Sequence, residues 1–257
     1  MPYEYNLAPK ALAEQCAAFK RAHPTLDDLP FDDYVMMPKY DGCLAIITPD
    51  GVITRTGEPI SSIPQCSQAV AEVLPGHAVF GEVYKFDTPF KDISGSFRRH
   101  KPQPDLLVVV FDAVPFKDWL TAKCDKPYIE RYAALREAVL HTPTPSLIVA
   151  PALDLEAPQG FANALVATGG YDGAIIRRKS AGWATGASKN GEAIKVKPVQ
   201  SLDLRATDWF VGKGKYQGLA GGIVVEYRGV TTQVGTGFSD SERATIASQG
   251  TRNQIAE

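Results

Sequence analysis

Apolar positions along the chain follow two periods, one helical and one alternating, and they predict a mixture of helices and strands. The apolar spacing in an alanine-rich segment predicts a helix over residues 7–22. Further helical patterns lie at residues 64–74, 128–140 and 158–168. Short apolar runs between turns predict strands at residues 34–38, 43–48, 52–55, 78–84, 106–112, 147–152, 173–178 and 192–197. This mixture favours an α+β domain over a regular parallel βαβ array.

The pattern changes after Pro198, where glycine-rich turns separate short strand-like runs. We expect strands over residues 202–210, 221–227 and 230–236, arranged as a small β-barrel. The sequence therefore predicts two domains, one spanning residues 1–200 and the other residues 201–257.

Composition favours a soluble globular protein. The 257 residues are 44% hydrophobic, which suffices for two ordinary domains. No apolar run reaches the roughly 18 residues that a membrane helix requires, and the N-terminus lacks a secretory pattern. The four cysteines are scattered and form no CxxC pair, as is typical of reduced thiols. We therefore expect a cytoplasmic protein without a membrane partner, and a monomer because no heptad pattern is evident.

The net charge of -2 excludes a polycation, but the basic residues are clustered. The clusters are Arg98-Arg99-His100-Lys101, Arg177-Arg178-Lys179, Lys195 with Lys197, and Lys213 with Lys215. Any one of them fits a solvated surface. Several of them on one face would follow a phosphate backbone, so the overall charge does not exclude a nucleic-acid partner.

The tetrapeptide Lys39-Tyr40-Asp41-Gly42 lies between two apolar runs. A lysine that is fixed by rigid elements and partly desolvated can become a nucleophile. A surface lysine beside a hairpin turn is the alternative that the tetrapeptide alone allows, because short motifs often match by chance.

Acidic and basic residues elsewhere provide the partners that such a lysine needs. Glu82 and Asp172 stand in or beside apolar strand patterns, where a carboxylate is costly unless it meets a cation or lies on an exposed edge. Lys195 and Lys197 stand two residues apart and therefore share one strand face. Their repulsion favours a bound anion such as phosphate between them, although a solvated sheet edge would also tolerate the pair. Carboxylate oxygens suit magnesium. A nucleophile, two carboxylates and a lysine pair together indicate phosphoryl or nucleotidyl transfer.

Six short motifs, in their order along the chain, resemble motifs I, Ia, III, IIIa, IV and V of the covalent nucleotidyltransferases. They are Lys39-Tyr40-Asp41-Gly42, Thr54-Arg55-Thr56-Gly57, Phe80-Gly81-Glu82-Val83, Val110-Phe111-Asp112, Asp172-Gly173-Ala174-Ile175-Ile176-Arg177 and Ile194-Lys195-Val196-Lys197-Pro198. The segments 212–218 and 235–240 are similar to the OB-fold domain of small phage or bacterial ATP-dependent DNA ligases. The resemblance implies an ATP-grasp-like ligase adenylation domain followed by an OB-fold β-barrel, in a bacterial or phage-infected cell.

The resemblance also implies a role for each matching residue. Lys39 would take AMP from ATP as a covalent adduct, Lys195 and Lys197 would hold the phosphates, and Phe111 would stack on adenine. Arg55 would contact the nucleotide or the 5′-phosphate of a nick. Glu82 would bind the ribose or, with Asp172, hold Mg²⁺ or Mn²⁺. The residues expected to bind nicked duplex DNA are Arg98, Arg99, Lys213 and Lys215.

Three departures from the family pattern keep alternatives open. Leu44 replaces the arginine that DNA ligases usually carry, and RNA ligases often have leucine there. Asp172 replaces a glutamate. Motif VI is missing, which implies an incomplete OB-fold domain or an impaired first step. The leading interpretation is an ATP-dependent DNA ligase acting in replication, repair or recombination. An RNA ligase, a capping guanylyltransferase and a non-catalytic nucleic-acid-binding relative are the alternatives.

Overall fold

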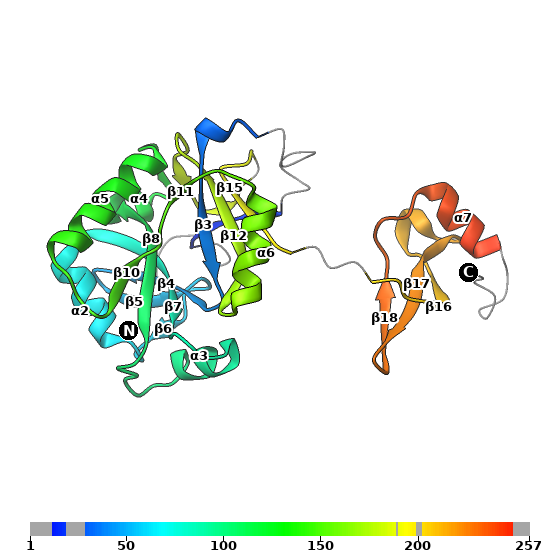
Figure 1. Cartoon of the computed structure of the whole chain (residues 1–257), viewed down its shortest axis with the longest axis horizontal. Helices are drawn as coiled ribbons and strands as arrows, with labels where there is room; N and C mark the ends of the chain where they lie inside the picture. Colours follow the sequence, from blue (N-terminus) through cyan, green and yellow to red (C-terminus); the bar gives the residue numbers. More distant parts are fainter. Residues whose placement is uncertain (1–11, 19–28, 189, 199–201, 249–257) are drawn as a thin grey trace. The chain divides into compact units, whose positions relative to one another are not determined.

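The computed structural model describes residues 12–18, 29–188, 190–198 and 202–248 (Figure 1). The chain divides into two compact units, Met1–Pro198 and Val199–Glu257, and each is described by itself. No helix in the described ranges is both long and apolar enough to span a membrane.

Two β-sheets form the framework of the first unit. One sheet has the order β10-β8-β7-β4-β5-β6 and is antiparallel except where β10 joins β8. Its strands are β4 (Cys43–Thr48), β5 (Gly51–Thr54), β6 (Pro59–Ile60), β7 (His77–Tyr84), β8 (Leu107–Pro115) and β10 (Leu147–Val149). The other sheet has the order β11-β3-β12-β15-β2. Its strands are β2 (Ala17–Ala18), β3 (Tyr34–Tyr40), β11 (Leu153–Asp154), β12 (Tyr171–Arg178) and β15 (Ala193–Val196).

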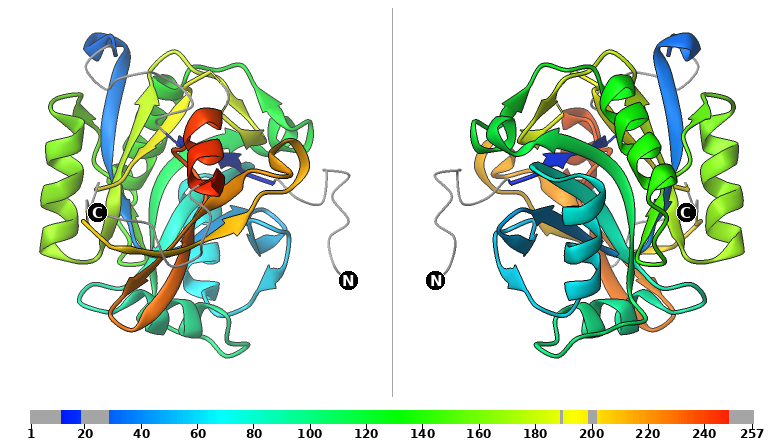
Figure 2. Two further views of the ribbon diagram at one scale, coloured as in Figure 1. Left: turned by 90° about the vertical axis from the view of Figure 1, so that its right-hand side faces the viewer. Right: turned by 90° about the vertical axis from the view of Figure 1, so that its left-hand side faces the viewer.

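Helices cover both sheets. Helices α2 (Pro64–Val73) and α5 (Tyr128–His141) pack on the six-stranded sheet, and α6 (Pro158–Thr168) lies along the five-stranded sheet, as the right view in Figure 2 shows. The shorter helices are α3 (Phe90–Phe97) and α4 (Phe116–Leu120). Short strand pairs join β1 (Glu14–Gln15) to β14 (Gly186–Ala187) and β9 (Lys123–Cys124) to β13 (Trp183–Ala184).

Strand β3 separates two cores by the alternation of its side chains. Val35 and Met37 belong to the core that α2 and α5 share with the six-stranded sheet, whereas Tyr34 and Met36 pack in the core under α6. Successive side chains on a strand point to opposite faces. Lys39 continues the series of Val35 and Met37, so the strand directs it to the side where the two sheets face each other.

Most expected elements of the first unit are confirmed, but the helix over residues 7–22 is wrong where the structure describes it. Within residues 12–18 the backbone forms β1 and β2, which pair with β14 and β15; residues 7–11 and 19–22 lie outside the described residues. The Leu12 carbonyl accepts a hydrogen bond from Trp119 Nε1 at 3.0 Å. Strand pairing and burial of Leu12 therefore override the helix propensity of an alanine-rich segment. The helices α3 and α4 were not expected.

The second unit is a three-stranded antiparallel sheet with one helix. Its strands β16 (Ala206–Val211), β17 (Ala220–Tyr227) and β18 (Val230–Val234) lie in chain order, and α7 (Asp240–Ser248) packs on the sheet. Arg243 of α7 donates hydrogen bonds to the carbonyl groups of Ala220, Gly221 and Gly235. Within residues 202–248 the sheet is open, so the expected closed barrel is not observed, and α7 was not expected.

Candidate functional site

Lys39 lies where the chain passes from one sheet to the other. It is the penultimate residue of β3 in the five-stranded sheet, and Cys43 begins β4 in the six-stranded sheet. The turn between them is therefore a crossover, not a hairpin. Gly42 makes the crossover possible, because a Cβ atom there would lie 2.2 Å from the Val83 carbonyl oxygen. This position brings the amine of Lys39 between two rigid sheets.

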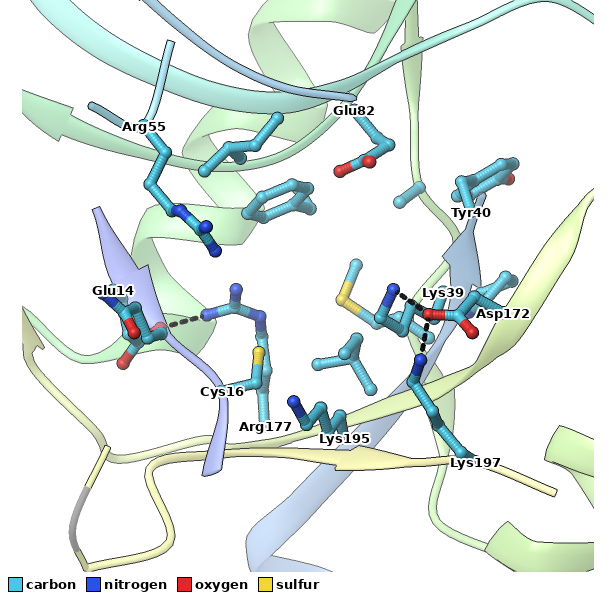
Figure 3. A pocket seen from close by; sticks show the side chains of 17 residues that line it. Glu14, Cys16, Lys39, Tyr40, Arg55, Glu82, Asp172, Arg177, Lys195 and Lys197 are labelled. Atoms are coloured by element: carbon cyan, nitrogen blue, oxygen red, sulfur yellow. Dashed lines mark hydrogen bonds and ion pairs between the residues drawn. The ribbon is translucent and has the colours of Figure 1, made fainter. Parts of the chain in front are cut away.

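Lys39 faces a cavity of about 330 Å³ that residues of both sheets line. Every residue predicted to bind the nucleotide or metal lines this cavity: Lys39, Arg55, Glu82, Phe111, Asp172, Lys195 and Lys197. Figure 3 shows Lys39, Asp172 and Lys197 together at one end and Glu14, Cys16 and Arg177 at the other. The topology thus brings together predicted residues that are up to 158 positions apart, since Lys39 and Lys197 share one site.

Asp172 joins two lysines at the first end of the cavity. Its Oδ2 atom lies 2.6 Å from Lys39 Nζ and 2.7 Å from Lys197 Nζ. Burial opposes the charged carboxylate, but the hydrogen bonds from Lys197 and Lys39 outweigh it and hold the pKa of Asp172 below its ordinary value. The two lysine amines therefore share one carboxylate at this end of the cavity.

A strand irregularity directs Asp172 to this position. The register between β12 and β3 shifts between Tyr171 and Gly173, as at a β-bulge. Gly173 has φ +127°, and a Cβ atom there would lie 2.1 Å from the Val196 carbonyl oxygen. The bulge and the close approach of β15 both require glycine after the aspartate.

Glu82 occupies a central strand and not an exposed edge. Strand β7 lies between β8 and β4, and Glu82 pairs with Leu44 across the sheet. Burial raises the pKa of Glu82 to about 7, although Lys39 and the backbone N–H of Gly42 favour its charged form. The carboxyl group points into the cavity (Figure 3), where it can accept or donate a hydrogen bond near neutral pH.

A buried charge network forms the other end of the cavity. Arg177 Nη1 lies 2.7 Å from Glu14 Oε2 and 3.8 Å from Asp112 Oδ2. Asp112 also accepts two hydrogen bonds from Arg131, at 2.9 Å and 2.8 Å. The Arg177 guanidinium carbon lies 5.1 Å from the centre of the Phe111 ring. These contacts fix the predicted stacking ring against a cation on a rigid wall.

Sequence reasoning did not identify Glu14, Cys16 and Arg177 as site residues, although all three line the cavity. Alternation along β12 would have found Arg177, because Ile175 and Arg177 both line the cavity and stand two residues apart. Glu14 and Cys16 had no such signal, because their segment reads as a helix. Burial raises the pKa of the Cys16 thiol, so it is not an activated nucleophile.

The cavity favours anions. Its ionisable lining comprises the five cations Lys39, Arg55, Arg177, Lys195 and Lys197 and the three carboxyl groups Glu14, Glu82 and Asp172. Cations therefore exceed carboxyl groups by two. In the part of the chain that the structure describes, no group of three or more His, Cys, Asp or Glu side chains is arranged to hold a metal ion. The lining thus suits a phosphate-bearing ligand better than a bare cation.

The residues predicted to bind DNA belong to different units. Arg98 and Arg99 follow α3 in the first unit and are exposed. Lys213 and Lys215 lie in the second unit, and Lys215 Nζ is 4.4 Å from the centre of the Tyr216 ring. Their joint role stays a prediction.

Comparisons with known proteins agree with this architecture. Residues 211–255 match the family model of the DNA ligase OB-like domain. The structure named Pmar-Lig_PreS3 superposes with a TM-score of 0.69 at 20% identity, covering 93% of this chain and 60% of that one. A Lig E DNA ligase gives 0.64 at 21% identity over 91% and 87% of the two chains. The ATP-dependent DNA ligase from bacteriophage T7, in complex with ATP, gives 0.54 at 15% identity over 92% and 83%.

The chain has the fold of the ATP-dependent DNA ligases: a nucleotidyltransferase domain followed by an OB-like domain. The fold that the family resemblance implied and the α+β class predicted from the mixture of helices and strands are thereby confirmed. The chain spans 60% of the length of Pmar-Lig_PreS3. No curated protein is significantly similar to it in sequence.

Proposed function

We propose that this protein is an ATP-dependent DNA ligase that seals nicks in duplex DNA through a covalent lysyl-AMP intermediate. The observation that carries the proposal is the position of Lys39. Its side chain lines a cation-rich cavity between two sheets, beside Asp172 and Lys197. A nucleophilic amine and fixed positive charge are the components that nucleotidyl transfer requires.

Three displacements at phosphorus account for the reaction. The deprotonated amine of Lys39 attacks the α-phosphorus of ATP, a P–N bond forms, and pyrophosphate leaves. An oxygen of the 5′-phosphate at the nick then attacks the adenylated phosphorus, and the lysine amine is released. Finally the 3′-hydroxyl attacks the activated 5′-phosphate, AMP leaves, and the phosphodiester bond is formed.

The other cavity residues bind and orient the nucleotide. Lys195 and Lys197 neutralise phosphate charge, and Lys197 is free to do so once phosphate replaces Asp172 as its partner. Phe111 offers its ring to the base. Arg55 contacts the nucleotide or the 5′-phosphate, and Glu82, with its raised pKa, hydrogen-bonds the ribose.

A divalent cation fits this site only together with the nucleotide. Asp172 and Glu82 supply carboxylate oxygens, the donors that Mg²⁺ and Mn²⁺ prefer, and two carboxylates with substrate phosphates form a typical magnesium shell. When bound, the ion would supply charge neutralisation at the phosphates.

DNA is the favoured polynucleotide. Leu44, which pointed to RNA ligases, lines the same cavity as Lys39. The match of residues 211–255 to a DNA ligase OB-like domain favours a duplex DNA substrate.

Incubation with α-³²P-ATP and magnesium, followed by a denaturing gel, tests the first step. We expect label on the wild-type protein and none on Lys39→Ala. Lys85→Ala is the matched control, because Lys85 is also a partly exposed lysine paired with an aspartate, Asp105, at 3.1 Å. An unlabelled wild-type protein that seals pre-adenylated nicks would contradict only this step. Nicked DNA and nicked RNA duplexes, compared at equal concentration, test the substrate.

A further inference from the structure

Four aromatic rings form a row that passes beside Lys39 and ends at the protein surface. In order they are Tyr171, Tyr40, Tyr84 and Phe86. Tyr40, the neighbour of Lys39, lies 5.1 Å from both Tyr171 and Tyr84, measured between ring centres. Tyr84 lies 5.3 Å from Phe86 with the ring planes perpendicular. The row bridges the two sheets, because Tyr40 and Tyr171 belong to β3 and β12 whereas Tyr84 ends β7.

The inner rings are firmly held and the outer ring is open. Tyr84 is buried, and its hydroxyl lies so close to Gly170 that a Cβ atom there would be 2.2 Å away. Burial and Tyr171 raise the pKa of Tyr40 to about 12, so its hydroxyl stays neutral. Phe86, in contrast, is 52% exposed. An exposed phenyl ring supported edge-on by a buried ring presents a fixed apolar face to solvent.

The segment that follows the exposed ring is basic. Residues 85–101 contain five lysines and arginines, Lys85, Lys91, Arg98, Arg99 and Lys101, but only two acidic residues, Asp87 and Asp92. Helix α3 lies within this segment and packs against β4 and β7, the strands that border the cavity. The second exposed aromatic ring of the segment, Phe90, begins this helix. Aromatic rings among positive charges are the combination that binds nucleic-acid strands by stacking and phosphate contacts.

We propose that Phe86, supported by Tyr84 and Tyr40, stacks against the terminal base at the strand break and aligns that strand end with the cavity. The inference rests on the proposed function and extends it to a second site on the first unit. The row leads from the residue beside Lys39 to the surface in two ring-to-ring steps of 5.1 Å and 5.3 Å.

Fluorescence of a base analogue tests this contact. 2-Aminopurine is placed at the nick, at the 3′ end or at the 5′ end in separate duplexes, and a 3′-dideoxy terminus prevents sealing. We expect wild-type protein to quench one of the two probes, and Phe86→Ala to remove the quenching and weaken binding of the nicked duplex about tenfold. Phe86→Leu should behave like Phe86→Ala, and Phe86→Tyr should restore quenching, because stacking needs the ring and not only apolar area.

The matched control is Phe31→Ala, since Phe31 is 47% exposed but precedes the opposite end of β3. It should bind and quench as the wild type does. Label transfer from ATP to Lys39 needs no polynucleotide and should be unchanged in Phe86→Ala. Unchanged quenching and affinity in Phe86→Ala would overturn the inference while leaving the ligase proposal intact. Loss of the lysyl-AMP adduct in Phe86→Ala would also overturn it, because the ring would then support the fold.

Discussion

Two aspartates in the first unit each lie between two basic side chains, yet their surroundings differ. Asp112 is held by Arg131 and approached by Arg177, and its side chain is 1% exposed. Asp172 is held by Lys39 and Lys197, and its side chain is 29% exposed. The bond lengths are nearly equal, from 2.6 Å to 2.9 Å for the close pairs. Distance alone therefore does not tell a structural ion pair from an exchangeable one.

Burial and the choice of cation distinguish the two sites. Arginine is planar and always charged, and its fork matches a carboxylate in two places, which suits a permanent buried contact. Lysine is flexible and can lose its proton, which suits a contact that must open during a reaction. The Asp112 site therefore fixes the cavity wall, whereas the Asp172 site holds Lys39, the lysine that we propose as the nucleophile.

The largest expected effect is the loss of the Asp112 carboxylate. Asp112→Ala leaves the Arg131 guanidinium buried without its main partner, and a broken buried pair costs about 3–5 kcal/mol of stability. Urea unfolding followed by circular dichroism should show this loss. Arg131→Ala should cost a similar amount, and the double variant should cost less than the sum of the two, because the residues contact each other. Additive losses would contradict a coupled buried pair.

The sequence motifs placed Phe111 and Asp112 together but did not reveal what holds them. Arg131 lies on α5, and no spacing rule connects a helix residue to a strand 19 positions earlier. The predicted nucleotide and metal residues, which all line the cavity, could be proposed from the sequence because each stands in a local motif. Glu14 was missed because strand pairing of residues 12–18 depends on contacts with β14 and β15, more than 160 positions away. Long-range pairing of this kind leaves no local signal.

The next effect separates Glu82 from Asp172, because burial raises the pKa of Glu82 to about 7, whereas the hydrogen bonds from Lys197 and Lys39 lower the pKa of Asp172. The folded protein then binds more protons than the unfolded chain between pH 4.5 and 7, so stability falls as the pH rises through this window. The loss is at most about 3 kcal/mol. Glu82→Gln should be more stable than the wild type at pH 8 and should lack this pH dependence. Urea unfolding midpoints of both proteins at pH 5 and pH 8 measure this pH dependence. The same change of stability with pH in the wild type and in Glu82→Gln would contradict the role of Glu82.

A smaller stability effect and a clear kinetic effect are expected at Asp172. Asp172→Asn removes the negative charge that orients Lys39, so lysyl-AMP formation should slow about 10- to 100-fold, or about 1.4–2.8 kcal/mol in activation free energy. Stability should change by less than about 1 kcal/mol because the site is partly exposed. Single-turnover labelling with ATP measures the rate. Asp105→Asn, at an exposed aspartate paired with Lys85, should leave it unchanged. A stability loss like that of Asp112→Ala would mean that the two sites share one role.

The smallest effect on stability is expected at an ion pair on the exposed surface. Lys123 and Asp125 form an ion pair of 2.8 Å, as short as the Arg131–Asp112 contact, but both side chains are mostly exposed. Solvent screens such a pair, and ordering two side chains costs entropy, so its net contribution is about 0–1 kcal/mol. Lys123→Ala should therefore shift the urea unfolding midpoint only slightly, and about 0.5 M salt should abolish this shift because it screens the pair. A loss above about 2 kcal/mol would show that bond length, and not burial, determines the strength of ion pairs in this fold.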